Sequence, residues 1–413
     1  MIFWNCYSNK IVMAMRVGKE TYYMAAIYLA PFYLLVCVYI LLRSLHWFQV
    51  LHTVFQNVWV CRGIGLVYLF VVFSILIAFM APASGFRRFM KLLSNYWLGV
   101  LMYTLMTLGI ADGLRLLLKY PFRNFAFPGR ELLFSNMGTA VVGAVCAVII
   151  STVSIYGVLS AGNIHTTKYN ISVDKKAGNM KELNVVLIAD LHLGYNIGCK
   201  QMEQMTEKIN EQKPDLVVVA GDIFDNNFDA LDNPERLEML LSQINSTYGT
   251  YAVFGNHDVT ETLIAGFPIS SKNAPRDPRM YEFLEKSNIS VLEDETAIID
   301  NSFYLTGRLD EKRTGNGTKK RASLDELTKN LDPSMPLFVI SHEPDHLSDY
   351  NAHGVDIVLS GHTHAGQFFP LTIVQPFVWE NYWGMKMIDS MYSFVTSGIG
   401  VYGPDMRVGT NSE

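Results

Sequence analysis

Residues 184–192 read Asn-Val-Val-Leu-Ile-Ala-Asp-Leu-His, an apolar run that ends abruptly on polar side chains. A short run of β-branched and apolar residues between polar flanks predicts a buried strand. Similar runs occupy residues 216–220, 251–254, 337–340 and 356–360, and the segment 200–210 between the first two predicts a helix. Short strands that alternate with helical stretches are typical of a layered α/β domain, which we expect from residue 183 onward.

Each predicted strand is followed at once by side chains that can bind a metal. They are Asp190 and His192; Asp222 and Asp225; Asn256, His257 and Asp258; His342 and Glu343; and His362 and His364. Open α/β sheets place ligands at the carboxyl ends of their strands, so we expect these side chains to meet. Residues two apart in an extended chain point the same way, which lets Asp190 with His192, and His362 with His364, offer paired ligands. The alternative is that they are ordinary core or loop residues.

In this order the motifs resemble those of the calcineurin-like metallophosphoesterase family, over about residues 183 to 408. Each motif is weak alone, whereas five in order at strand ends are specific. Gly-His-Thr-His-Ala-Gly-Gln at 361–367, Gly398-Ile-Gly400 and Arg407 make the sequence similar to the bacterial membrane-bound branch, which includes enzymes similar to UDP-2,3-diacylglucosamine pyrophosphatase. The resemblance implies a four-layer α/β sandwich. Family members usually continue into a final strand, whereas this sequence stops at Glu413.

The resemblance also implies a dinuclear metal site. One cation is expected on Asp190, His192 and His364, the other on Asn256, His342 and His362, with Asp222 bridging both. His257 is not a ligand in this pattern; it would donate a proton to the leaving group or stabilise charge, and Asp225 would orient it. Imidazole with carboxylate suits Mn²⁺ first, with Fe, Zn or Ni as alternatives. A metal-bound hydroxide would then attack the phosphorus of an ester or pyrophosphate.

The N-terminal part of the chain predicts a membrane domain. Apolar segments at about 22–42, 63–81, 96–118 and 135–156 each approach the roughly 20 residues that a helix needs to cross a bilayer. We therefore expect a four-helix transmembrane bundle over residues 1–160, a linker over 161–182 and the phosphoesterase domain over 183–413. More Lys and Arg residues flank the end shared with that domain, which predicts a multi-pass protein of the cell membrane with a cytoplasmic catalytic domain.

Ionisable residues inside the third segment are a functional candidate by default. Asp112 and Arg115 lie one turn apart there, and the alternative to a functional pair is a helix-end pair that supports packing. A net charge of −5 and a pI near 6.1 provide no basic surface, so no nucleic-acid partner is expected.

An aromatic and apolar segment, residues 368–383, follows the last predicted ligands directly. It would contact the bilayer or the acyl part of a lipid-linked substrate, or else pack as a lid on its own domain. For Asp258 and Glu343 we expect either support of a neighbouring ligand or a plain turn role. The functional alternative to a hydrolase is a membrane sensor or transport protein whose phosphoesterase-like domain only binds a ligand. Oligomeric state has no signature in the sequence.

Overall fold

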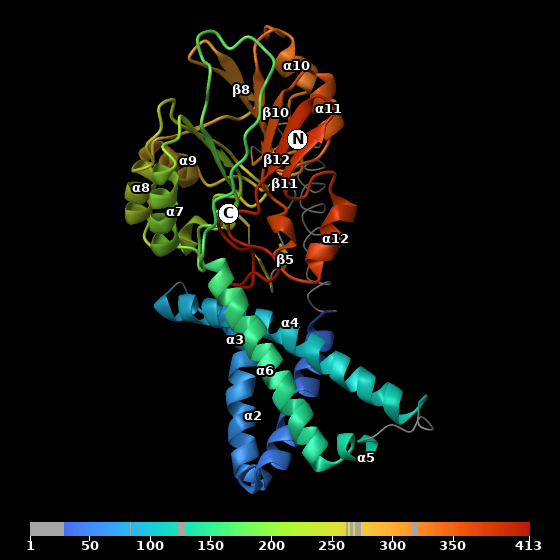
Figure 1. Ribbon diagram of the computed structural model, residues 1–413. Coiled ribbons are helices and arrows are strands. Elements are labelled where there is room, and N and C mark those ends of the chain that lie inside the picture. The colour runs from blue at the N-terminus through green and yellow to red at the C-terminus, as the bar shows by residue number, and fades with distance from the viewer. Residues whose placement is uncertain are drawn as a thin grey trace, which may run out of the picture. The chain divides into compact units, whose positions relative to one another are not determined.

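The computed structural model describes residues 29–82, 84–122, 129–261, 263–264, 267–268, 274–315, 317 and 320–413 (Figure 1). The chain divides into two compact units, one formed mainly by residues up to Val158 and the other mainly by residues from Leu159 onward. Each unit has its own apolar core, and we describe them separately.

Long apolar helices build the N-terminal unit. They are Leu29–Leu51, α2 (Val58–Val72) with α3 (Ser74–Met80), α4 (Gly85–Lys119) and α6 (Asn136–Ala161), with the short η1 (Thr53–Gln56) and α5 (Arg130–Leu133) between them. Three of the described helices are long and apolar enough to cross a membrane, and a fourth span is added if α2 and α3, bent by 48°, are one crossing. Residues 22–28 of the first predicted segment lie outside the described part of the chain.

The intramembrane acid pairs with a different arginine from the one we expected. Asp112 accepts hydrogen bonds from Arg43 Nη2 at 2.6 Å and from the Tyr39 hydroxyl at 2.7 Å, both on the helix Leu29–Leu51. Arg115 instead donates to Thr139 Oγ1 of α6 at 3.1 Å. The predicted pairing of Asp112 with Arg115 is therefore wrong, because each side chain points to a neighbouring helix. Both contacts tie helices together, as the packing alternative requires.

Two β-sheets form the centre of the C-terminal unit. The first is parallel, in the order β1-β2-β3-β6, with β1 Val185–Ile188, β2 Leu216–Ala220, β3 Thr250–Val253 and β6 Ile289–Val291. The second is mixed, in the order β11-β12-β10-β9-β8-β7, with β7 Glu295–Ile299, β8 Phe303–Gly307, β9 Leu337–Ile340, β10 Ile357–Ser360, β11 Gly384–Ile388 and β12 Met391–Val395. A small hairpin, β4 (Leu263–Ile264) with β5 (Phe267–Pro268), lies outside them.

Three apolar cores hold these layers together. Side chains of β1, β2 and β3, such as Val218, pack against those of β8 to β10, such as Leu305 and Leu359, and form the core between the sheets. The outer face of the parallel sheet packs against α7 (Cys199–Glu211), α8 (Pro234–Ser242) and α9 (Pro278–Lys286) (Figure 1). The outer face of the mixed sheet packs against α11 (Leu347–Ala352), with α10 (Leu324–Thr328) beside it. The predicted α/β class is confirmed.

The register of the strands brings their carboxyl ends to one edge. Ile188 pairs with Val219, Ala220 with Val253, and Ile340 with Leu359, all in parallel. The loops after β1, β2 and β3 therefore leave one edge of the first sheet together, and those after β9 and β10 leave one edge of the second. Three short helices follow these loops in sequence: η2 (Phe228–Ala230), η3 (His364–Gly366) and α12 (Leu371–Val378).

Candidate metal centre

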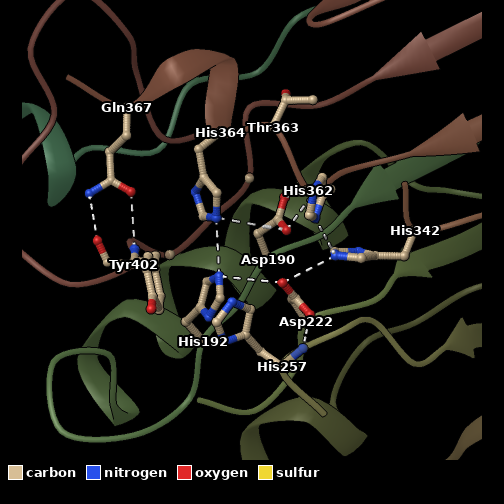
Figure 2. A network of polar contacts seen from close by, with 12 residues as sticks. Asp190, His192, Asp222, His257, His342, His362, Thr363, His364, Gln367 and Tyr402 are labelled. Atoms are coloured by element: carbon tan, nitrogen blue, oxygen red, sulfur yellow. Dashed lines mark hydrogen bonds and ion pairs between the residues drawn. The ribbon is translucent and has the colours of Figure 1, made fainter. Parts of the chain in front are cut away.

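The carboxylate of Asp222 lies at the middle of a cluster of imidazoles (Figure 2). Its Oδ2 atom is 3.1 Å from His342 Nε2 and 3.8 Å from His192 Nε2. Its Oδ1 atom accepts a hydrogen bond of 2.7 Å from the backbone N–H of His257. Asp222 follows β2, the central strand between β1 and β3, and so it can reach ligands that come from both sheets.

Two groups of donor atoms flank this carboxylate. On one side His192 Nε2 lies 3.1 Å from His364 Nε2, which is 3.9 Å from Asp190 Oδ1. On the other side His342 Nε2 lies 3.1 Å from Asn256 Oδ1 and 3.2 Å from His362 Nδ1. The structure thus brings together all seven predicted ligands, in the two groups that the resemblance implies. Within each group the donor atoms lie 3.1 to 3.9 Å apart, close enough for one cation to contact them all.

Burial keeps three of the histidines in the form that binds a metal. Burial lowers the pKa of His192 to about 3, and it holds the pKa of His362 and of His364 well below the usual range. A neutral imidazole has a free nitrogen lone pair, which a protonated ring lacks. Neutral imidazoles beside carboxylate oxygens are a donor set that fits divalent transition metals.

The pKa values of the carboxyl groups of Asp222 and Asp190 are shifted in opposite directions. Burial alone would raise the pKa of Asp222, but the positive charge of His342 and His257 outweighs it and holds that pKa well below its usual range. Burial raises the pKa of Asp190 to about 7, although its oxygens accept two hydrogen bonds of 3.0 Å from the His362 backbone N–H. His342, surrounded by Asp222, Asp190 and Asp310, has its pKa raised well above the usual value despite its burial.

The loops that carry the ligands are strained. Asp190, His192, Asp222, His362 and His364 all have φ between 46° and 71°, in the left-handed region that non-glycine residues rarely adopt. Such strain is concentrated at functional sites, where the surrounding fold maintains it. The residue just before Asn256 must be glycine, because a Cβ at Gly255 would lie 2.3 Å from Asp222 Oδ1.

His257 is held by a residue that the sequence analysis did not assign. Its Nδ1 atom is 2.8 Å from Asn226 Oδ1, and the predicted partner Asp225 has its Oδ1 atom 4.0 Å from His192 Nδ1. An amide oxygen only accepts, so Nδ1 carries the hydrogen and Nε2 is the atom available to a substrate. Asp225 still belongs to the cluster, because its carboxylate, His192 and His257 offer atoms within 4.8 Å of one another. The signal for Asn226 was only its position next to Asp225.

Tyr402 is a second residue that sequence reasoning missed. Its ring centre is 4.6 Å from that of His257. Buried Gln367 holds its backbone with two hydrogen bonds: Gln367 Nε2 donates to Tyr402 O at 3.1 Å, and Gln367 Oε1 accepts from Tyr402 N at 3.0 Å (Figure 2). Burial raises the pKa of Tyr402 to about 12, so its phenol keeps a proton at neutral pH. The 35-residue separation between Gln367 and Tyr402 left no local pattern to detect.

Asp258 and Glu343, the two acids close to predicted ligands in the sequence, have distinct partners. Asp258 is fully buried and accepts hydrogen bonds of 2.7 Å from the backbone N–H groups of Phe224 and Gly255. It thereby joins the loops after β2 and β3, which carry Asp222 and Asn256. Glu343 contacts Lys312 Nζ at 2.6 Å, and its other oxygen is 3.7 Å from His362 Nε2, which places it beside a ligand.

Stacked sheets with Asp, Asn and His gathered at their strand ends define a metal-dependent phosphoesterase domain. Residues 183–366 match the family model described as calcineurin-like phosphoesterase. The chain therefore carries a calcineurin-like metallophosphoesterase domain, and this family consists of hydrolases that act on phosphoester bonds.

Similar proteins include membrane proteins. An uncharacterized metallophosphoesterase of Campylobacter jejuni is 28% identical over 297 residues, 70% of this chain and 72% of that protein. A Danio rerio protein described as a transmembrane protein with metallophosphoesterase domain is 27% identical over 100% of this chain and 94% of its own length. UDP-2,3-diacylglucosamine pyrophosphatase of Chlamydia trachomatis is 24% identical over 49% of this chain and 70% of that protein. The expected likeness to bacterial membrane-bound enzymes therefore extends to a vertebrate protein.

Proposed function

We propose that this chain is a membrane-anchored, dinuclear metal-dependent phosphoesterase that hydrolyses a phosphoester or pyrophosphate bond of a lipid-linked substrate. The observation that carries the proposal is the meeting of seven predicted ligand side chains from five strand ends, with Asp222 at the middle and His257 beside them. Two divalent cations, manganese first among them, would lower the pKa of a shared water and neutralise the oxygens of the phosphoryl group.

The protein's own residues complete the reaction. Asp190, His192 and His364 would hold one cation, Asn256, His342 and His362 the other, and Asp222 both. His257 would place Nε2 at the leaving oxygen and donate the proton that this oxygen needs. Asn226 keeps the hydrogen on Nδ1, so the proton to be transferred resides on Nε2. We assign to Asp225 a supporting part, as an acid that lies beside both His257 and His192.

The phenol of Tyr402 extends this machinery. Its ring lies against His257, and its proton is retained at neutral pH, so it can donate a hydrogen bond to a substrate oxygen. A bound phosphoester would then meet cations on one side and two hydrogen-bond donors on the other. This arrangement suits phosphomonoesters, diesters and pyrophosphates alike, because all three present the same non-bridging oxygens.

The membrane part of the proposal rests on the helices and on the relative that matches the whole chain. Three apolar helices and the transmembrane relative indicate a membrane protein. We infer four crossings, with the bent pair α2 and α3 as one span, and hence a multi-pass protein with a cytoplasmic catalytic domain. We also infer the four-layer sandwich of the family, which the three separate cores of the C-terminal unit support. The pyrophosphatase among the relatives supports a lipid-linked substrate.

The test uses the full chain in detergent with Mn²⁺, and bis(p-nitrophenyl) phosphate and p-nitrophenyl phosphate as substrates. His257→Ala should lower kcat by about 10² to 10⁴ while the bound manganese, measured by elemental analysis, stays the same. Asp222→Asn should lower both activity and bound manganese, because it removes a charge that both cations share.

His353→Ala and Asp325→Asn are matched controls. These two residues contact each other at 3.1 Å, and the Asp325 side chain is 90% exposed. Both controls should retain activity. The proposed activity is refuted if no divalent metal supports hydrolysis, or if Asp222→Asn leaves hydrolysis unchanged.

A further inference from the structure

The helix α12 is uncharged and exposed. Its sequence is Leu-Thr-Ile-Val-Gln-Pro-Phe-Val, and none of its residues is buried. The exposed fractions reach 86% for Phe377, 62% for Val378 and 57% for Ile373. Single exposed apolar side chains are normal on a protein surface, but a whole helix of them marks an interaction site.

In α12 the polar side chains face the domain and the apolar ones face outward, which is the reverse of a helix whose outer side faces water. A Cβ on Gly366 would lie 2.8 Å from Thr372 Cα and 3.0 Å from Gln375 Cγ, so the two polar positions of the helix face its own domain. The exposed large apolar side chains occupy the opposite arc and define what we call the outer face: Leu371, Ile373, Val374, Phe377 and Val378. A surface helix in water places its apolar stripe inward. The outer face of α12 is therefore suited to contact with an apolar medium and not with water.

The outer face adjoins the candidate metal centre. Gly366, against which α12 packs, is two residues beyond His364. At the other end of the helix the Trp379 ring lies 5.2 Å from the ring of His362, at 80°. The hydroxyl of Thr363, between the two ligands, donates to Tyr382 O at 2.6 Å. Both ends of the segment 366–382 are thus fixed to the loop that carries His362 and His364.

We propose that α12 is an interfacial helix whose outer face lies in the bilayer. Lipid is the occupant that fits, because the same chain has three helices apolar enough to cross a membrane and α12 has no charge to pair with a protein partner. Eight residues rise only about 12 Å, too short to span a bilayer, so the helix lies in its plane. Trp379, Tyr382 and Trp383 follow it, and aromatic side chains of this kind favour the headgroup level.

The placement has a consequence for the substrate, which rests on the proposed function. With α12 in the interface, the loop of His362 and His364 lies at the depth of lipid headgroups. A phosphoester whose alkyl or acyl chains stay in the bilayer would then reach the site without leaving the membrane. The substrates of the proposed phosphoesterase are therefore membrane-embedded phosphoesters and not water-soluble ones.

Photo-crosslinking of the full chain in phosphatidylcholine liposomes tests the lipid contact. A p-benzoylphenylalanine is placed at Phe377 and, as control, at Met239 of α8, which is 57% exposed. We expect radiolabelled phosphatidylcholine to be attached at position 377 and not at 239. Attachment of position 377 to a second copy, to the chain's own helices or to no lipid overturns the proposal.

A paired activity assay separates this inference from the proposed function. Hexadecyl p-nitrophenyl phosphate in vesicles and bis(p-nitrophenyl) phosphate in detergent share the phosphodiester and the leaving group and differ in the alkyl chain. Phe377→Glu should lower vesicle hydrolysis about 10-fold and leave the soluble reaction unchanged, whereas Met239→Glu should change neither. Equal effects of Phe377→Glu on both substrates overturn the interfacial role. If the unaltered chain hydrolyses neither, the proposed function fails, while the crosslinking result still decides the lipid contact.

Discussion

Replacement of Arg407 by methionine should destabilise the catalytic domain and weaken its metal site together. Arg407 is fully buried, and Nη2 donates to the backbone oxygens of Ser397, Gly398 and Gly400 at 2.6, 3.0 and 2.7 Å. Nη1 donates to His364 O at 3.3 Å. Burial lowers the pKa of Arg407 to about 10, so the guanidinium is charged at neutral pH.

The size of the effect follows from the carbonyl groups that lose their donor. A hydrogen bond to a charged group contributes about 1.5 to 3 kcal/mol, and the contributions of one guanidinium overlap, so we expect a loss of about 3 to 5 kcal/mol. For a domain of this size, about 1 kcal/mol changes Tm by roughly 2 to 4 °C, which predicts a decrease of roughly 10 °C. Arg407→Lys keeps the charge but not the planar fork, and should lose about half as much.

Arg407→Met should also weaken metal binding by the predicted ligands. A Cβ on Gly398, which has φ of 84°, would lie 2.7 Å from Asp190 Cβ, so the segment that Arg407 fixes packs directly on a predicted ligand. We expect the affinity for Mn²⁺, measured by calorimetric titration below the unfolding temperature, to fall about 10-fold in Arg407→Met. The assays are thermal unfolding and metal titration of the full chain in detergent. A methionine variant that melts within about 2 °C of the parent and binds Mn²⁺ equally well refutes the reasoning.

Other perturbations should have separate effects. Asn226→Leu removes the acceptor of His257 Nδ1 and should lower kcat about 10- to 100-fold with bound manganese unchanged; an unaltered kcat would show that the amide does not orient the ring. Gln367→Leu removes the two hydrogen bonds from this side chain to the Tyr402 backbone and should lower the free energy of unfolding by about 2 kcal/mol in a urea titration. Chelation by EDTA should lower Tm by an amount equivalent to about 3 to 4 kcal/mol if the metal was present at 100 to 1,000 times its Kd, an effect that should be absent in Asp222→Asn.

Much of the C-terminal unit was predictable because its strands are short, apolar and bounded by polar residues. The predicted runs at 216–220 and 337–340 coincide with β2 and β9, and the others differ from β1, β3 and β10 by one or two residues. The strands β6, β7, β8, β11 and β12 were not predicted from the sequence. β11, for example, reads Gly-Met-Lys-Met-Ile with three exposed positions, so its pairing with β12 rather than its composition makes it a strand.

In the N-terminal unit the sequence predicted the helices but not the contacts between them. Hydropathy located its helices, since crossing a bilayer demands a long apolar run whatever its neighbours are. It did not reveal that Asp112 pairs with Arg43, 69 positions away. Sequence proximity favoured Arg115, but the direction of a side chain around a helix axis is decided by packing.

The sequence by itself determined which side chains are candidates for the chemistry: the seven predicted ligands and His257, which follow the ends of strands in the two sheets. It could do so because a strand's alternation and its polar end are local properties. Only the tertiary structure decided that Asn226 holds His257, that Gln367 and Tyr402 join across 35 residues, and that the apolar side of α12 faces outward. These depend on how separate loops meet once both sheets have packed, and contacts between distant segments leave no periodic trace in either one.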